Sequence, residues 1–554
     1  MSSTVNFRKI IGLSAALMLG LDVMQAAVTL PQIFSDGMVV QRDRPLTLWG
    51  TAEPGEKFEI KVTKGPKATV SADADGRWKA ELQPLKTGRT YTIEVGDKTI
   101  GNVAVGDVLL CSGQSNMELP VKRVTDMFAD EIAAYRNPDI RQFYIPREFD
   151  FTTERTDVNP TGWKSVDDDA MNFSALAYFT AKALNAETGL PVGVINTCWG
   201  GTPIESWISE KYLSDLPYYI NQKRIYEDEA YRSAIKAQES RNYAVWNSVI
   251  DNNDPGLTGK VKFHSPALDD SSWDEIDLLS TSWPSDGMSP QSGAHWFRKT
   301  IDIDAAHAGK KATLRLGCIV DADSAWVNGR QVGFTSYQYP PRIYTIPEGV
   351  LKEGKNVIAI RLISNGGAPH FVPEKPYKVI FGDRPYAIYG QTLPDEISLE
   401  GKWRYHRGTP MPGSPSSVTF HYMPAVLYNA MIAPVIDYPV RGALWYQGES
   451  NVGRSEQYPT LLKKMVTNWR EASGDDSMPF YVVELADFIH KDDKWQRASW
   501  QKMRDRQAEA CHDIPGATLI HNSDLGEWND IHPLDKKTLG KRVADAITAD
   551  MKQK

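Results

Sequence analysis

Short runs of alternating apolar and polar residues fill the N-terminal part of the chain. The clearest runs are residues 38–40, 46–50, 58–62, 78–82 and 91–95. Turn residues separate them, among them Pro54 with Gly55 and Asp75 with Gly76. Alternation with a period of two, interrupted by turns at this spacing, is typical of strands with one buried face. The pattern predicts a small N-terminal β-sandwich over residues 27–104.

Near residue 106 the pattern changes to continuous apolar runs followed by segments of helical length. In one unit a helical segment at 175–188 precedes an apolar strand at 191–196. The later units are the apolar runs 442–446 and 480–485 and the helical segment 495–511. This alternation predicts an α/β fold, in which helices flank a parallel sheet.

A second group of alternating strands interrupts the α/β pattern. Its strands are predicted at residues 296–303, 312–317, 324–329 and 356–362. Asn328 followed by Gly329 is a strong hairpin signal. We therefore expect the α/β domain to be split into residues 105–253 and 410–554, with a β-sandwich inserted at 254–409.

The first residues have the features of an export signal. Arg8 and Lys9 precede an apolar stretch at residues 10–21, and Ala26 with Ala27 offers a small-residue cleavage region. We expect residues 1–26 to be removed and the protein to be exported, periplasmic or extracellular, without a membrane anchor. An uncleaved N-terminal anchor is the alternative.

Charge and cysteine content narrow the classes of partner. The formal net charge of −8 gives no attraction to nucleic acid or to an anionic membrane. The four cysteines have no close spacing of the kind that binds zinc, so no metal and no cofactor are expected. We leave them unpaired, although a disulfide between Cys111 and Cys198 is as compatible with the sequence as two packed thiols, and the oligomeric state is left open. The cysteines are Cys111, Cys198, Cys318 and Cys511.

Ser115 lies where an apolar run stops at a Gly-Gln-Ser turn and a helix-compatible segment begins. Gly113 permits a sharp turn, and a hydroxyl at a helix start lies beside free amide donors. These are the requirements of a nucleophile. Taken alone, the motif is equally compatible with a serine that only satisfies the turn. The blocks that favour catalysis lie further along the chain, at residues 199–207, 445–451 and 529–533.

These blocks, with Gly-Gln-Ser-Asn-Met at 113–117 and Tyr-Asn-Ala-Met-Ile-Ala-Pro at 428–434, resemble the sialate O-acetylesterase family of SGNH-type hydrolases. The inserted segment resembles the sugar-binding β-sandwich of the β-galactosidase superfamily, notably at residues 326–329 and 354–357. The resemblance implies an SGNH-hydrolase parallel sheet flanked by helices, an N-terminal β-sandwich and an inserted jelly-roll-like β-sandwich. It also implies hydrolysis of acetyl esters on sugars.

His532, which precedes Pro533, is the expected base for Ser115. A surface or helix-capping histidine is the alternative for His532. SGNH-type enzymes place the supporting carboxylate three residues before the histidine, and that position is Asn529 here. An amide cannot stabilise imidazolium as a carboxylate does. We therefore expect Asp530 to orient the ring, with Asp524 as the second choice, or a Ser-His dyad held by a backbone carbonyl.

The oxyanion formed during acyl transfer needs hydrogen-bond donors. The expected donors are the amides of Ser115 and Gly201 and the side chain of Gln447, with Asn451 competing for the role of Gln447. Asn116 belongs to the serine block and is a possible support. Glu449 is interpreted as a hydrogen-bonding scaffold, not as a catalytic acid.

The predicted function is deacetylation of carbohydrates through an acetyl-serine intermediate. O-acetylated sialic acids and acetylated plant glycans such as xylan or xyloglucan both stay open as substrates. A sialate carboxylate would favour an arginine at the site, and Arg123, Arg441 and Arg454 lie near the blocks in sequence. A non-catalytic carbohydrate-binding protein is the alternative outside enzymes. A glycosidase lacks support, because no barrel repeat with paired carboxylates is visible. The inserted sandwich is expected to lie beside the mouth of the site.

Overall fold

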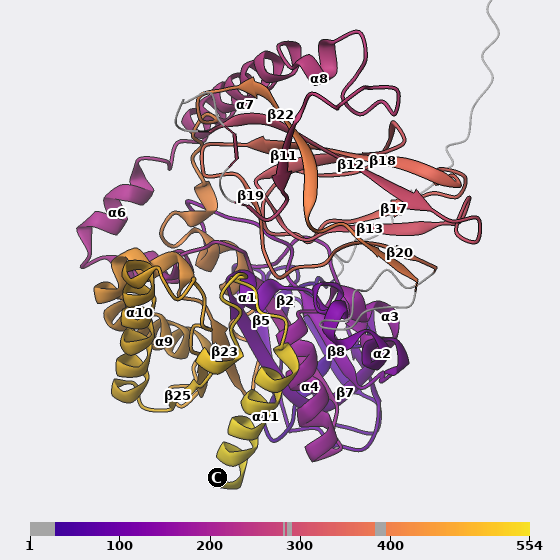
Figure 1. Cartoon of the computed structure of the whole chain (residues 1–554). Helices are drawn as coiled ribbons and strands as arrows, with labels where there is room; N and C mark the ends of the chain where they lie inside the picture. Colours follow the sequence, from indigo (N-terminus) through magenta and orange to yellow (C-terminus); the bar gives the residue numbers. More distant parts are fainter. Residues whose placement is uncertain (1–27, 281–282, 285–290, 383–394, 554) are drawn as a thin grey trace, which may run out of the picture.

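The computed structural model describes residues 28–280, 283–284, 291–382 and 395–553. The expected export signal at 1–26 lies outside the described residues. Figure 1 shows a sheet flanked by helices in one half of the molecule and a unit of long antiparallel strands in the other half.

The helix-flanked sheet is parallel over six neighbouring strands, with one antiparallel strand at an edge. The order is β25 (Ala517–Ile520), β24 (Phe480–Val483), β23 (Gly442–Tyr446), β7 (Lys98–Gly113), β10 (Val192–Cys198), β8 (Ile140–Tyr144) and β9 (Trp163–Ser165). Strands β10, β23 and β24 are buried along their whole length, which explains their continuous apolar sequences. The α/β class predicted from the sequence is confirmed.

Helices pack on both sides of the strands (Figure 1). Helix α4 contacts α11, and α9 contacts α10. The longer helices of this half are α2 (Thr125–Ala134), α4 (Ala175–Thr188), α9 (Tyr458–Ser473), α10 (Lys494–Asp513) and α11 (Lys536–Gln553), and the short ones are α1 (Ser115–Glu118), α3 (Val166–Asp169) and α5 (Glu210–Leu213).

The order of the strands reverses direction at β7, since later strands are added on both of its sides. The last residues of the three central strands lie in register, with Gly113 opposite both Cys198 and Tyr446. A Cβ on Gly113 would lie 2.1 Å from the Tyr446 carbonyl oxygen, so only glycine allows these strand ends to approach. The chain segments that follow all three strands therefore emerge at one edge, where α/β proteins bind their ligands.

The N-terminal strands are β1 (Val39–Gln41), β2 (Leu46–Thr51), β3 (Lys57–Val62), β4 (Lys67–Ser71), β5 (Arg77–Leu82) and β6 (Tyr91–Val95). All five strands predicted here are confirmed, and β4 is additional. Strand β7 pairs with β6 and then continues into the parallel sheet, and the N-terminal strands share one hydrophobic core with that sheet. A separate N-terminal sandwich stays a prediction.

The second half of the molecule, called the two-sheet unit, comprises residues 274–410. One sheet has the order β11 (Asp274–Asp277), β22 (Lys402–Pro410), β12 (Gly293–Ile303), β18 (Gly354–Ser364), β15 (Ala322–Val327) and β16 (Arg330–Thr335). The other has the order β17 (Ile343–Ile346), β13 (Ala312–Leu316), β20 (Tyr377–Phe381) and β21 (Glu396–Ser398). Strands β14 (Ile319–Val320) and β19 (His370–Phe371) form a short pair. The two sheets share a core of their own.

The predicted hairpin at Asn328 and Gly329 joins β15 to β16, and both residues have the positive φ that a tight hairpin needs. Helices α6 (Pro217–Arg224), α7 (Glu229–Asn252) and α8 (Pro255–Thr258) lead from the parallel sheet to the two-sheet unit. The unit is held to α2 by the ion pair between the buried Arg315 and Asp126. All four cysteines are buried free thiols, so the alternative of a disulfide between Cys111 and Cys198 is not seen. Within the described part of the chain, no helix combines the length and apolar character needed to cross a membrane.

Candidate active site

A cavity of about 1280 Å³ lies at the edge where the central strands end. Ser115 and His532 both line it. Its wall also includes Tyr337, Tyr339 and Pro340 from the segment between β16 and β17, so the two-sheet unit contributes to it. The serine and the histidine, which are separated by more than four hundred residues in the chain, therefore line the same cavity.

Ser115 is the first residue of α1, directly after the Gly113-Gln114 turn. Its hydroxyl and its backbone N–H have no hydrogen-bond partner among the described residues, because the first N–H groups of a helix have no partner within the helix. Both groups are therefore available to a ligand in the cavity.

His532 lies in the segment between β25 and α11 and is only 6 % exposed. Its ring meets the Tyr339 ring edge to face, with the centroids 5.2 Å apart. Burial, followed by the nearby cations of Arg123 and Lys536, lowers the pKa of His532 to about 3. The imidazole is therefore neutral, and able to accept a proton, over the whole range from mild acid upwards.

Asp530 accepts a hydrogen bond from the backbone N–H of His532 at 2.9 Å. The same carboxylate oxygen lies 3.9 Å from His532 Nδ1, which is buried and has no hydrogen-bond partner among the described residues. This separation exceeds a hydrogen bond but is short enough for an electrostatic attraction once the ring is charged. Asn529, at the position where the resemblance places a carboxylate, instead donates to the Pro373 carbonyl oxygen at 2.7 Å.

The two-sheet unit holds the segment that carries His532 through residues 373–375. The buried Lys375 ammonium pairs with Glu527 at 2.9 Å and with Asp530 at 3.1 Å. The indole N–H of Trp528 donates to Glu374 at 3.0 Å. With the bond from Asn529, these contacts fix the four consecutive positions 527–530, shortly before His532. Truncating either side would leave buried charge without its partner.

Asn116 connects the serine block to the two other blocks. Its amide donates to Glu449 Oε1 at 2.6 Å and to the Ile531 carbonyl oxygen at 2.9 Å, and its oxygen accepts from Lys536 Nζ at 2.7 Å. Burial raises the pKa of Glu449 and lowers the pKa of Lys536 to about 8. The scaffold role expected for Glu449 agrees with these contacts, which join the nucleophile helix to the residue before His532.

The structure revises the expected set of oxyanion donors. Gly201 lines the cavity at a φ of +78°, and its N–H has no partner within the described chain, whereas the N–H of Gly200 donates to Glu118. Gln447 is fully buried. Its NH₂ group donates to the Thr202 carbonyl oxygen and to Asn451, and Gln447 does not line the cavity. Gln447 was expected to be an oxyanion donor, but these internal contacts use both of its N–H groups.

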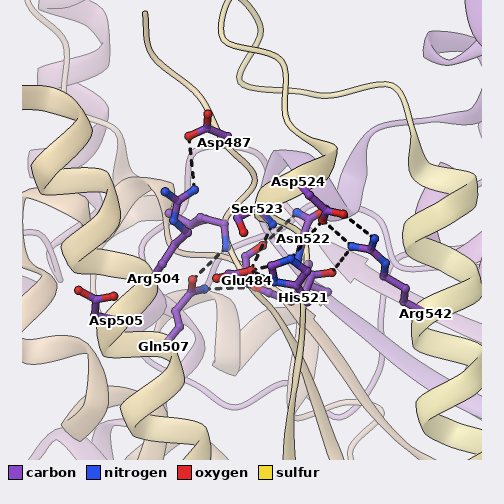
Figure 2. Close-up of polar contacts among 12 residues, drawn as sticks. Glu484, Asp487, Arg504, Asp505, Gln507, His521, Asn522, Ser523, Asp524 and Arg542 are labelled. Carbon is purple, nitrogen blue, oxygen red and sulfur yellow. Dashed lines mark hydrogen bonds and ion pairs between the residues drawn. The ribbon is translucent and has the colours of Figure 1, made fainter. Parts of the chain in front are cut away.

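Asn451 and Asp524 also lie outside the cavity lining. Asn451 accepts from the backbone N–H of Ile204 and donates to Glu205, so it braces the neighbouring loop. Figure 2 shows Asp524 directed toward Arg542 and His521, and the two bonds from Arg542 measure 2.6 and 2.7 Å. That pairing lowers the pKa of Asp524 to about 2. Asp524 is a surface ion-pair partner and is not placed to orient His532.

Sequence reasoning missed several residues of this site. Lys375, Lys536 and Tyr339 contact the catalytic blocks only through the tertiary fold, and no motif includes them. Tyr422 also lines the cavity, and its hydroxyl packs so closely on Gly201 that a Cβ there would lie 1.9 Å from it. Arg123 had been considered only as a substrate-binding group. Its guanidinium donates to the Tyr339 carbonyl oxygen at 3.1 Å, and its positive charge helps to lower the pKa of His532.

No cluster of three histidine, cysteine, aspartate or glutamate side chains suited to a metal occurs among the residues that the structure describes.

Comparison with known proteins adds a family match to this geometry. Residues 413–549 match the family model described as carbohydrate esterase, sialic acid-specific acetylesterase. This stretch contains the Glu449 and His532 blocks. The chain is also 26% identical over 198 residues to the sialate O-acetylesterase of Mus musculus, a match covering 32% of this chain and 36% of the mouse protein. With the Homo sapiens protein it is 27% identical over 202 residues, covering 32% and 38% of the two chains.

These matches span just over a third of the length of the curated relatives. Among solved structures, a carbohydrate acetylesterase from Xanthomonas citri has a similar fold. Its TM-score is 0.55 at 22% identity, and the alignment covers 95% of this chain and 76% of the other. The likeness to that structure extends over both halves of the molecule.

Proposed function

We propose that this protein is a serine esterase that removes O-acetyl groups from carbohydrates through an acetyl-serine intermediate. The observation that carries the proposal is that one cavity is lined by a serine hydroxyl without a hydrogen-bond partner in the described part of the chain and by a buried, neutral histidine. The family match over residues 413–549 and the sialate O-acetylesterase relatives support the reaction class.

In the proposed reaction His532 removes the proton from Ser115 while the serine oxygen attacks the acetyl carbonyl carbon. The carbonyl oxygen becomes an oxyanion that accepts hydrogen bonds from the N–H groups of Ser115 and Gly201. The imidazolium then gives its proton to the departing sugar oxygen, which leaves as a hydroxyl. A water molecule, deprotonated by His532, attacks the acetyl-serine in the same way, and acetate leaves with the serine restored.

Asp530 is proposed as the carboxylate that stabilises the imidazolium. Its oxygen lies 3.9 Å from His532 Nδ1, which has no hydrogen-bond partner among the described residues. Lys375 pairs with Asp530 and holds the carboxylate in place. A Ser-His dyad is the alternative, in which the charge of Asp530 contributes little.

The contacts of the three candidate arginines decide which of them could bind the carboxylate of a sialic acid. Arg441 pairs with the buried Asp107 at 2.8 Å, and Arg454 pairs with Glu205 at 2.7 Å. Arg123 lines the cavity and has no carboxylate partner in the described parts of the chain. If the substrate is an O-acetylated sialic acid, Arg123 is the residue proposed to bind its carboxylate.

An acetylxylan or acetyl-xyloglucan esterase is the second candidate. The size of the cavity favours it, because 1280 Å³ exceeds the roughly 300–1,000 Å³ of ordinary small-ligand sites.

We also propose that the protein is exported and that the two-sheet unit is a sugar-binding, β-galactosidase-type insertion at residues 254–409.

The test is acetate release from p-nitrophenyl acetate, O-acetylated sialosides, acetylated xylan and acetylated xyloglucan fragments. We expect release from at least one sugar ester, and its loss in Ser115→Ala. A parent protein that releases no acetate from any of the four substrates, while still binding glycans, would support the non-catalytic carbohydrate-binding alternative.

A further inference from the structure

The cavity extends well beyond the reacting groups. Ser115, His532 and the Gly201 N–H need room only for one acetyl group and the sugar atom that bears it. Part of the remaining lining comes from two elements outside the parallel sheet, namely α6 and the segment between β16 and β17. Figure 1 shows α6 at the edge of the molecule, outside the helices that cover the sheet. Neither element is needed to hold an acetyl ester.

Three tyrosines on these outer walls expose their rings. Tyr218 of α6 is 67% exposed, and Tyr337 and Tyr339 after β16 are 53% and 40% exposed. All three line the cavity. Large aromatic side chains gathered in a concave surface mark a binding site. Tyrosine offers a flat apolar face and a polar end at a low cost in conformational entropy.

The polar lining also suits a chain of sugars. Gln222 lies four residues after Tyr218, on the same face of α6, and it lines the cavity beside that ring. The acidic lining residues Glu118 and Glu205 are neutralised by ion pairs with Arg147 and Arg454. Flat apolar rings beside amides and neutralised charges match the two surfaces of a pyranose, its C–H face and its hydroxyl edge.

We infer that the outer part of the cavity is a binding groove for an oligosaccharide, with Tyr218 and Tyr337 as stacking subsites for sugar rings next to the acetylated one. The inference rests on the proposed function, because it assumes that the acetyl group lies at Ser115. It assigns acetylated chains of two or more sugars as the preferred substrate class, over free acetylated monosaccharides and simple esters.

The test compares acetate release from acetylated xylose, xylobiose and xylotriose with hydrolysis of p-nitrophenyl acetate. The parent kcat/KM is expected to rise with chain length. Tyr337→Ala and Tyr218→Ala are each expected to lower kcat/KM about tenfold on xylotriose acetate, mainly through KM, an effect of ~1.4 kcal/mol. Both variants should hydrolyse p-nitrophenyl acetate as the parent does. Tyr337→Phe should keep the parent values, since stacking uses the ring.

Phe334→Ala is the matched control. Phe334 is 71% exposed on β16 of the same unit but does not line the cavity, so its loss should leave every substrate unaffected. A kcat/KM independent of chain length would overturn the inference, as would equal losses on xylotriose acetate and p-nitrophenyl acetate.

Binding separates this inference from the proposed function. Calorimetric titration of the Ser115→Ala protein with unacetylated xylotriose reports on the groove even when no acetate is released. Binding that weakens when Tyr337 or Tyr218 is also replaced by alanine supports the groove. If the parent hydrolyses acetyl esters but Ser115→Ala does not bind xylotriose, the groove is wrong and the esterase assignment stands.

Discussion

Burial of His532 and the nearby cations of Arg123 and Lys536 predict an unusual pH dependence. A base must be neutral to accept a proton, so activity is lost as the pH falls through the pKa of the free enzyme's histidine. An ordinary histidine of pKa 6.5 would be about 3% neutral at pH 5, and kcat/KM there would be about 25-fold below its value at pH 7. With a pKa of about 3, His532 stays about 99% neutral at pH 5, so kcat/KM should hardly change between pH 5 and 7.

Burial is the largest cause of the lowered pKa of His532, and the charge of Arg123 comes next, so Arg123→Gln tests the charge part of the shift. Among the charged groups, Arg123 contributes most to the lowered pKa of His532. Two carboxylates on neighbouring elements carry the opposite charge: Asp530 lies near the ring, and Glu449 interacts electrostatically with Lys536. Without the Arg123 cation, the imidazolium is less unfavourable, and the pKa of His532 rises toward 6.5. The pH below which kcat/KM falls should therefore be higher in Arg123→Gln than in the parent. Each pH unit of this difference corresponds to about 1.36 kcal/mol of lost destabilisation of the imidazolium.

The assay measures acetate release from p-nitrophenyl acetate between pH 3.5 and 8, because a neutral ester removes any role of Arg123 in substrate binding. Lys122→Gln is the control, since Lys122 lines the same cavity but donates to Asn172 and does not perturb His532. Circular dichroism at each pH checks that the proteins remain folded. A parent acid limb near pH 6.5, or an unchanged limb in Arg123→Gln, would refute the reasoning.

Three further predictions concern the surroundings of the reacting groups. Lys375→Met should lower the free energy of unfolding by roughly 3 kcal/mol and reduce kcat even on p-nitrophenyl acetate, as judged by urea denaturation and initial rates, and Lys375→Arg should restore much of both. Gly201→Ala should reduce kcat by about 10²-fold or more with little change in KM, because its Cβ would clash with Tyr422 and displace the donor N–H; equal rates would remove Gly201 from the oxyanion site. Asp524→Asn should keep kcat within about twofold in the same assay, since Asp524 pairs with Arg542 at the surface; a large loss would return it to the catalytic candidates.

Much of the fold was predictable because it depends on local patterns. Period-two alternation identified five N-terminal strands, and the apolar runs at β10, β23 and β24 identified the parallel sheet. Strand β4, Lys-Ala-Thr-Val-Ser, was missed although it alternates, because Ala68 and Val70 are its only apolar residues, and both are only partly buried. Nothing local indicated that β7 would run on from the N-terminal strands into the parallel sheet, since that depends on which partners it finds.

The site was predictable only where a motif carries the chemistry. Ser115 and His532 were identified, and both line the cavity. Proximity in sequence does not reveal that the Gln447 amide donates to Thr202, which leaves the expected oxyanion donor engaged, or that Asp524, the second choice after Asp530, faces Arg542. Lys375 lies in a different half of the molecule, more than 150 residues before its partner Asp530, so only the folded structure relates the two.

The central claim is that Ser115 and His532 act as nucleophile and base on an acetyl ester. The most direct measurement is mass spectrometry of the protein mixed rapidly with an acetylated sugar and quenched in acid. The account predicts a transient gain of one acetyl group on Ser115, with no such gain in Ser115→Ala and a much slower one in His532→Ala. Acetate release at the parent rate by Ser115→Ala, or an acetyl group on another residue, would contradict it.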